Sequence, residues 1–260
     1  MTKKLIMFDI DGTLLDHEKQ LPESTKQAIK ELKEAGHEVA IATGRAPYFI
    51  KDIRKELEID SFVCFNGQYV ESDNEVIYKN PIDREYLHLL STHSSTNDHP
   101  LIFMGAESMK STVAKHADID ESLTSLAIDF TMLEMDANYY NDNEIYQTLL
   151  YCRADAESFY RENLQNLNFI RWHELSLDVL PIGGSKANGI EKYIEKRGYM
   201  KDQVYAFGDY LNDIEMLQYV GHGVAMGNAP DEVKKAARYV TKDVGEDGIA
   251  YGLEMVGLLK

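Results

Sequence analysis

Two aspartates one residue apart, Asp9 and Asp11, directly follow the apolar run LIMF at residues 5–8. Strand side chains at i and i+2 point to the same side, so the two carboxylates lie close together. Close carboxylates repel each other, so either one pKa rises or a cation lies between them. Mg²⁺ prefers a few carboxylates together with water and a substrate phosphate. A helix cap or a turn would explain one of these acids, but it explains the pair poorly.

Two further segments carry groups suited to an anion. Thr43 and Gly44 place a hydroxyl and a glycine before an expected helix, where free backbone N–H groups and the helix dipole favour negative charge. Lys186 opens another helix after Gly183–Ser185 and can reach a phosphate or hold a nearby carboxylate ionised. Taken alone, the first segment suits a simple helix N-cap equally well, and the second suits a solvated surface lysine.

A fourth segment, Gly208–Asp213, again ends an apolar run with a carboxylate, that of Asp209. Asn212 and Asp213 follow within one helical turn, although Asp213 alone would also suit a helix cap. An acid pair, a hydroxyl, a lysine and an acidic cluster at one edge of a sheet form the set that phosphoryl transfer requires. The four segments together therefore indicate phosphoryl transfer.

A sheet must position these segments, and the sequence predicts one. Apolar runs alternate with amphipathic helical segments across short turns, which is typical of a parallel sheet with crossover helices. Ligands of such sheets bind outside the carboxyl ends of the strands, where all four segments fall. The expected strands lie at residues 4–9, 37–45, 61–67, 203–209 and 221–227, and the expected helices at 22–37, 46–59, 185–198, 211–220 and 229–240.

The regular succession of strands and helices stops in the middle of the chain. There, helical stretches mix with segments in which apolar and polar residues alternate. Such a mixture is typical of an α+β unit with an antiparallel sheet. The helical stretches lie at residues 84–95 and 156–167, and the alternating segments at 124–135, 145–154 and 169–181.

We therefore expect an α/β fold with two domains. The core is a doubly wound parallel-sheet domain formed by residues 1–81 and 182–260. Residues 82–181 form one inserted α+β domain.

The charge composition of the chain limits the kinds of partner that it can bind. The 260 residues include 27 basic and 44 acidic ones, a net charge of −17. Nucleic-acid binders and proteins that dock on anionic membranes need basic surface, so we expect neither partner. A small anionic substrate is compatible with this charge if a metal or a few basic groups reverse the field locally.

The apolar segments and the cysteines indicate a cytoplasmic protein. No apolar stretch approaches the roughly 20 residues of a transmembrane helix. The N-terminal apolar run is too short for a signal peptide and is broken by Asp9. Cys64 and Cys152 both lie in apolar contexts, so we expect buried thiols rather than a disulfide framework.

The motifs DIDGTLL, TGR, the lysine of GGSKANGI and GDYLNDIEML resemble the four motifs of the haloacid dehalogenase (HAD) superfamily of phosphatases. The turn FNGQYV at residues 65–70 and the tail at residues 223–254 resemble the Cof-type subfamily, subfamily IIB with a C2 cap. The resemblance covers residues 3–81 and 182–258. It implies a HAD-like core, a cap that decides the substrate, and Mg²⁺-dependent hydrolysis of small phosphorylated metabolites through an aspartyl-phosphate.

The resemblance also assigns roles to residues of the four motifs. It implies that Asp9 is the nucleophile and that Asp11 is first the general acid and then the general base. The Asp9 and Asp209 carboxylates and the Asp11 backbone carbonyl would bind Mg²⁺, with support from Asp213. The residues expected to contact the phosphate or substrate are Ile10, Thr43, Gly44, Arg45, Lys186 and Asn212.

Other functions remain open. A signalling receiver module also places acids, a Thr, a Lys and Mg²⁺ around a phosphorylated Asp, but the acid pair and the long insert disfavour it. A phosphomutase would use the same nucleophile, and a silent phosphate-binding protein would lack turnover. Sugar, nucleotide and cofactor phosphates are all possible substrates, and the oligomeric state is open. In the insert, the candidates for substrate contact are Arg153, Arg171 and His173, and Trp172 is expected in its core.

Overall fold

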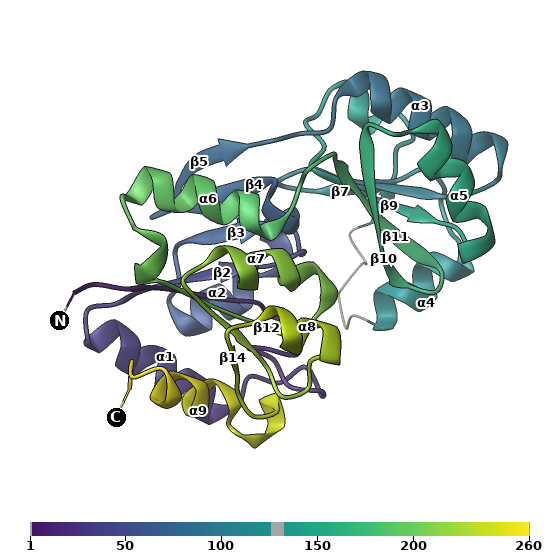
Figure 1. Ribbon diagram of the computed structural model, residues 1–260. Coiled ribbons are helices and arrows are strands. Elements are labelled where there is room, and N and C mark those ends of the chain that lie inside the picture. Colours follow the sequence, from purple (N-terminus) through teal and green to yellow (C-terminus); the bar gives the residue numbers. More distant parts are fainter. Residues whose placement is uncertain (1, 126–132, 260) are drawn as a thin grey trace. The chain divides into compact units, whose positions relative to one another are not determined.

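The chain divides into two compact units in a computed structural model that describes residues 2–125 and 133–259 (Figure 1). The core unit comprises Met1–Arg45, Ile50–Lys79 and Ser185–Lys260. The inserted unit comprises Asn80–Gly184 together with the short segment Ala46–Phe49. The insert that we expected from sequence, residues 82–181, does not include Ala46–Phe49.

The core unit is built on an eight-stranded sheet in the order β14-β13-β12-β1-β2-β3-β4-β5 (Figure 1). The six strands from β14 to β3 are parallel, and β4 and β5 add an antiparallel edge. The predicted α/β class with a parallel central sheet is therefore confirmed. The strands are β1 (Leu5–Phe8), β2 (Glu38–Ala42), β3 (Phe62–Cys64), β4 (Tyr69–Ser72), β5 (Glu75–Lys79), β12 (Val204–Gly208), β13 (His222–Ala225) and β14 (Tyr239–Val240).

Helices cover both faces of this sheet. Leu5 and Met7 of β1 share one buried cluster with Ile190 of α6 and Met216 of α7. On the opposite face, α9 packs against α1, and a Cβ on its Gly252 would lie only 2.7 Å from the Phe207 ring. The helices are α1 (Glu23–Glu34), α2 (Lys51–Leu57), α6 (Lys186–Arg197), α7 (Ile214–Tyr219), α8 (Asp231–Ala236) and α9 (Gly248–Met255), with 3-10 turns η2 (Phe65–Gly67), η4 (Lys201–Gln203), η5 (Leu211–Asp213) and η6 (Val244–Glu246).

Four expected elements of the core differ from the structure. The strand expected at 61–67 is β3 followed by the 3-10 turn η2. The helix expected at 46–59 is a 3-10 turn followed by α2, and the one expected at 211–220 begins as η5 before α7. The helix expected at 229–240 is α8 alone, and its predicted continuation was wrong. Tyr239 and Val240 instead pair in parallel with β13, because a β-branched and an aromatic residue suit a sheet edge better than a helix end.

The inserted unit has a six-stranded sheet in the order β10-β11-β9-β6-β7-β8, antiparallel except for the β7–β8 pair. This confirms the predicted α+β character, although residues 126–132 of the alternating segment expected at 124–135 lie outside the described residues. The elements are η1 (Pro47–Phe49), α3 (Arg84–Thr96), β6 (Leu101–Met104), β7 (Met109–Ser111), α4 (Ala117–Ser125), β8 (Glu134–Met135), η3 (Tyr139–Asn141), β9 (Gln147–Tyr151), α5 (Ala154–Asn163), β10 (Leu167–His173) and β11 (Ser176–Pro181).

Among the helices that the structure describes, none combines the length and the apolar character that crossing a bilayer requires.

Glu38, at the start of β2, is a partly buried acceptor at the amino-terminal edge of the core sheet. It accepts hydrogen bonds from Lys3 at 2.7 Å, Tyr199 at 2.8 Å, Arg197 at 3.0 Å, and Tyr193. Burial alone would raise the pKa of Glu38, but hydrogen bonds from Arg197, Lys3 and the two tyrosines lower it to about 2. A carboxylate with a depressed pKa stabilises the fold above its unfolded pKa, and this stabilisation is lost as the pH falls.

We therefore predict that Glu38→Gln lowers the free energy of unfolding at pH 7 by about 2–3 kcal/mol. Between pH 5 and pH 3 the native protein should lose stability steeply as Glu38 takes up a proton on unfolding, and the variant should lose less. Urea unfolding of both proteins at pH 7, pH 5 and pH 3 measures the free energy of unfolding and its loss with falling pH. Glu34→Gln, at an exposed position of α1, is the control and should change little. An equal pH dependence in Glu38→Gln and the native chain would contradict this account.

Candidate active site

The end of β1 places Asp9 beside the loop that follows β12. The Asp9 N–H donates to the Phe207 carbonyl at 3.0 Å, so the β1–β12 pairing continues one residue past the strand. The side chain of Ile10 is fully buried in the core. Gly12 then turns the chain with a φ of +77°, and a Cβ there would lie 2.3 Å from Asp209 Oδ2. Only glycine allows this close approach, which brings the acid pair and Asp209 together.

Lys186 joins Asp9 to the end of the fourth motif. Its Nζ donates to Asp9 Oδ1 at 2.6 Å and to Asp213 Oδ1 at 2.7 Å, and its side chain is completely buried. Ser185 caps α6 by accepting from the Asn188 N–H, which fixes the start of the helix that carries Lys186. Burial would lower the pKa of Lys186, but the adjacent Asp213 and Asp9 carboxylates raise it. The lysine therefore stays charged and pairs with both acids.

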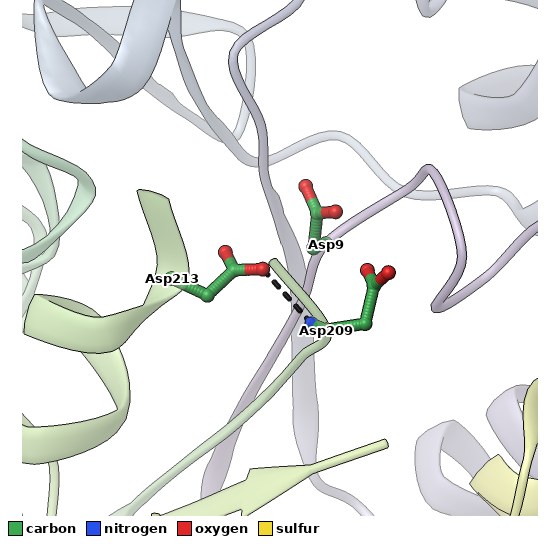
Figure 2. A group of neighbouring side chains, drawn as sticks. All are labelled: Asp9, Asp209 and Asp213. Atoms are coloured by element: carbon green, nitrogen blue, oxygen red, sulfur yellow. Dashed lines mark hydrogen bonds between the residues drawn. The ribbon is translucent and has the colours of Figure 1, made fainter. Parts of the chain in front are cut away.

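Asp213 holds the loop after β12 in place (Figure 2). Its Oδ2 accepts from the backbone N–H groups of Asp209 at 2.9 Å and of Tyr210 at 3.0 Å. A Cβ on Gly208 would lie 2.5 Å from Asp213 Cγ, so glycine is needed there as well. With Lys186 on Oδ1, both carboxylate oxygens of Asp213 are engaged within the protein.

Asp209 is oriented by two residues that our sequence analysis did not assign. Thr13 Oγ1 donates to Asp209 Oδ1 at 3.0 Å, and Asn228 Nδ2 lies 3.3 Å from Asp209 Oδ2. Asn228 also donates to the Gly12 carbonyl at 2.8 Å and accepts from the Val244 N–H at 3.0 Å. Its position just after β13, at the same edge of the sheet as the four motifs, is the signal that could have identified it.

Asp9, Asp209 and Asp213 form an acidic cluster suited to a cation. One carboxylate oxygen from each lies within 4.8 Å of the others. Figure 2 shows the Asp9 and Asp209 carboxylates side by side, with the Asp213 side chain reaching in from the start of α7. Burial raises the pKa of Asp9 well above its ordinary value, and burial together with the Asp213 charge raises that of Asp209 to about 7. A cation here would favour the ionised form of both groups.

Asp11, the second acid of the pair, has different partners. Arg45 donates from Nε to Oδ2 at 2.8 Å and from Nη2 to Oδ1 at 2.7 Å, and Lys19 donates to Oδ1 at 2.8 Å. Burial acts to raise the pKa of Asp11, but the hydrogen bonds from Arg45 and Lys19 outweigh it and lower the pKa. Arg45, which we expected to contact substrate, and Lys19, to which we assigned no role, both donate to Asp11. A contact between Arg45 and substrate stays a prediction.

The Thr43 loop is tied to Asn212 through Asn66. The Asn66 N–H donates to the Thr43 carbonyl at 3.1 Å, and Thr43 Oγ1 accepts from the Arg45 N–H. Asn212 Nδ2 donates to Asn66 Oδ1 at 2.9 Å, and a Cβ on Gly44 would lie 3.1 Å from the Asn66 amide. The structure thus brings Thr43, Gly44 and Asn212 to one network, organised by a buried asparagine in the FNG turn.

The candidates in the inserted unit are held within that unit. Arg171 donates to Glu157 at 2.9 Å and to the carbonyls of Cys152 and His173. This saturation explains Arg171 as a packing residue. Trp172 is half-buried, and Arg153 is exposed where α5 begins. A role for Arg153 or His173 toward a substrate stays a prediction.

The buried Lys186 should dominate the stability of the site. We predict that Lys186→Met lowers the free energy of unfolding by about 3–5 kcal/mol at pH 8, because it leaves buried carboxylates without their cation. The loss should be smaller at pH 5, since burial raises the pKa of Asp9 and a larger share of this carboxyl is then neutral and needs no counter-charge. Urea unfolding of the variant and of Lys30→Met, an exposed control on α1, measures both effects. A loss that is equal at the two pH values would contradict the account.

Comparison with known proteins identifies the family of the chain. A family model described as haloacid dehalogenase-like hydrolase matches residues 6–253. The chain is 49% identical over its full length to a putative phosphatase, YkrA, of Bacillus subtilis, with 100% of both chains covered. It is 32% identical to the 5-amino-6-(5-phospho-D-ribitylamino)uracil phosphatase YcsE of the same organism, covering 95% of this chain and 93% of that one.

A solved structure shows the same fold. The HAD subclass IIB sugar phosphatase BT4131 superposes with a TM-score of 0.88 at 28% identity, covering 99% of this chain and 100% of that one. The resemblance stated from the four motifs is confirmed by these matches. The chain belongs to the haloacid dehalogenase-like hydrolases, a family of enzymes.

Proposed function

We propose that this protein is a Mg²⁺-dependent phosphatase that hydrolyses small-molecule phosphate monoesters through an aspartyl-phosphate on Asp9. One observation carries the proposal. Lys186 holds Asp9 Oδ1, while no described residue donates a hydrogen bond to Asp9 Oδ2. A carboxylate fixed at one oxygen and free at the other is prepared to act as a nucleophile.

In the first half-reaction, Asp9 Oδ2 forms a bond to phosphorus while the bond from phosphorus to the ester oxygen breaks. The departing oxygen takes a proton from the Asp11 carboxyl and leaves as the alcohol. The products of this half-reaction are the free alcohol, a phosphoryl group on Asp9, and an ionised Asp11.

In the second half-reaction, Asp11 takes a proton from water as the water oxygen bonds to phosphorus. The bond between Asp9 and phosphorus breaks, so inorganic phosphate leaves and both aspartates return to their starting state. The lowered pKa of Asp11 favours the ionised form, which suits this base role. The acid role requires the negative charge of a phosphate bound beside Asp11 to raise that pKa, so that the carboxyl carries a proton when the ester binds.

The acidic cluster fits Mg²⁺. Carboxylate oxygens are hard donors of the kind that Mg²⁺ prefers, and the cluster brings three of them within 4.8 Å. Thr13 and Asn228 orient Asp209 as partners of a metal-bound carboxylate usually do. Asp9 and Asp209 would bind the ion with the Asp11 carbonyl, and Asp213 would support the site through its hydrogen bonds. Bound Mg²⁺ would neutralise charge on the phosphate and on these acids.

The remaining motif residues would hold the transferring phosphoryl group. Thr43 and Asn212 are both hydrogen-bonded to Asn66, Gly44 lies beside the Asn66 amide, and Lys186 adds a positive charge beside Asp9. Such fixed donors stabilise the charge that develops on phosphoryl oxygens. We propose that the inserted unit selects the substrate, since it is a separate compact unit without any of these groups.

Relatives of stated activity support a proposal for the substrate class. One is named as a sugar phosphatase, and another acts on a phosphorylated ribityl compound. We propose small phosphate monoesters of this general kind for the present protein, with sugar, nucleotide and cofactor phosphates as the compounds to test. A phosphomutase would use the same nucleophile, and it would return an isomeric phosphate ester rather than inorganic phosphate.

We predict that the native protein with Mg²⁺ releases inorganic phosphate from several members of a monoester panel. Asp9→Ala should reduce release by about 10⁴-fold or more, because it removes the nucleophile. Asp52→Ala, at an exposed position of α2, should retain native activity. Phosphate release by Asp9→Ala at a native rate would contradict the assignment, and isomerised ester without phosphate would indicate a mutase.

We predict that removing divalent metal with a chelator abolishes turnover and that added Mg²⁺ restores it. Asp209→Asn should weaken Mg²⁺ binding by about 10–100-fold or more, because it replaces a charged ligand by a neutral amide. Titration calorimetry with Mg²⁺ measures the affinity directly, with Asp52→Asn as the matched control. Unchanged Mg²⁺ affinity in Asp209→Asn would contradict this metal site.

A further inference from the structure

The carboxylate of Asp11 is held by three charged donors rather than left mobile. Arg45 donates to both oxygens, at 2.8 Å from Nε to Oδ2 and at 2.7 Å from Nη2 to Oδ1. Lys19 adds a third hydrogen bond, 2.8 Å from its Nζ to Oδ1. Arg45 is one of the motif residues, but Lys19 lies outside all four motifs. Its presence on this carboxylate therefore needs its own explanation.

The loop after Asp11 turns back on itself, so that the Lys19 side chain reaches the Asp11 carboxylate. Asp16 organises the turn, since its Oδ1 accepts from the N–H groups of Glu18 and Gln20, both at 2.9 Å. The Lys19 N–H closes the turn on the Asp16 carbonyl, and Lys19 adopts a φ of +59°. A positive φ is uncommon for a residue other than glycine, and it persists where surrounding interactions hold it. The loop thus delivers the Lys19 side chain to Asp11.

The three donors distinguish the two oxygens of Asp11. A carboxylate oxygen accepts about two hydrogen bonds. Oδ1 receives two, from Lys19 and Arg45, whereas Oδ2 receives one from the described residues, from Arg45 Nε. Oδ2 therefore keeps an acceptor position, and it is the atom able to carry the transferred proton.

We infer that Lys19 is a positioning residue that, together with Arg45, fixes the Asp11 carboxyl so that Oδ2 faces the reacting oxygen. The inference rests on the proposed function, in which Asp11 gives its proton to the leaving group. Without Lys19, Oδ1 would lose one of its two partners, and the carboxyl could rotate about its remaining contacts with Arg45. Catalysis by a proton donor falls steeply when its position is lost.

The alternative is an incidental surface ion pair. Exposed pairs are weak because water screens them and two long side chains must be ordered. The Lys19 and Asp11 side chains are each only 30% exposed, and Asp11 shares its charge with Arg45, which is 15% exposed. Partial burial and the shared acceptor favour a fixed arrangement.

The test compares substrates that differ in their need for a proton. An alkyl phosphate releases a poor leaving group that must be protonated, whereas p-nitrophenyl phosphate releases a stable phenolate. The ratio kcat/KM reports the steps up to alcohol release, so it isolates the acid role of Asp11 from its later base role. We would measure it for Lys19→Met, Lys19→Arg and the native protein, using the best alkyl ester of the panel. Lys26→Met, at an exposed position of α1, is the control.

We expect Lys19→Met to lower kcat/KM about tenfold or more for the alkyl ester and less than about threefold for p-nitrophenyl phosphate. Lys19→Arg should recover most of the loss, because it keeps a charged donor, and Lys26→Met should match the native protein. Equal losses on both esters, no loss, or a gain on the alkyl ester would overturn the role of Lys19 while leaving the phosphatase intact. Absence of native turnover on both esters would overturn the proposed function itself.

Discussion

A single buried ammonium group holds the site together. Lys186 lies between Asp9 and Asp213, at 2.6 Å and 2.7 Å, and all three side chains are nearly or fully withdrawn from water. Buried carboxylates are costly without a counter-charge, so this cation makes their closeness possible. Asp213 in turn fixes the loop after β12, because its other carboxylate oxygen accepts a hydrogen bond from the Asp209 backbone N–H. The positions of Asp9 and of the acidic cluster therefore depend on one lysine at the start of α6.

The loops around this centre also fix one another. Asn228 connects the loop after β1, through the Gly12 carbonyl, to the loop that contains Val244. Asn66 connects the Thr43 loop to Asn212 in the same manner. Fixed donors at a reacting centre need no reorganisation during the reaction, which is how an enzyme gains from a preorganised site. The asparagines thus stabilise an arrangement that the motif residues alone would not maintain.

The sequence predicted the parts of this site that depend on local pattern. Apolar runs ending in Asp9 and Asp209 identified strand ends, and the alternation of elements predicted the parallel sheet that the structure confirms. The partners of Lys19, Asn66 and Asn228 could not be predicted. They depend on which distant loops meet at the sheet edge, and two of these residues adopt a positive φ that ordinary propensities disfavour. The end of α8 was missed for a related reason, because the pairing of Tyr239 and Val240 with β13 joins separate segments of the chain and is not visible in the local pattern.

If Asp9 carries the phosphoryl group during turnover, that group can be trapped on the protein and located. Acid-quenched protein taken during turnover would be treated with borohydride, which reduces an aspartyl-phosphate to homoserine. Trypsin would then release residues 5–19, which contain Asp9, Asp11 and Asp16, for sequencing by mass spectrometry. The account predicts homoserine at position 9 and only in samples given substrate and Mg²⁺. Homoserine at position 11 or 16, or none during active turnover, would contradict it.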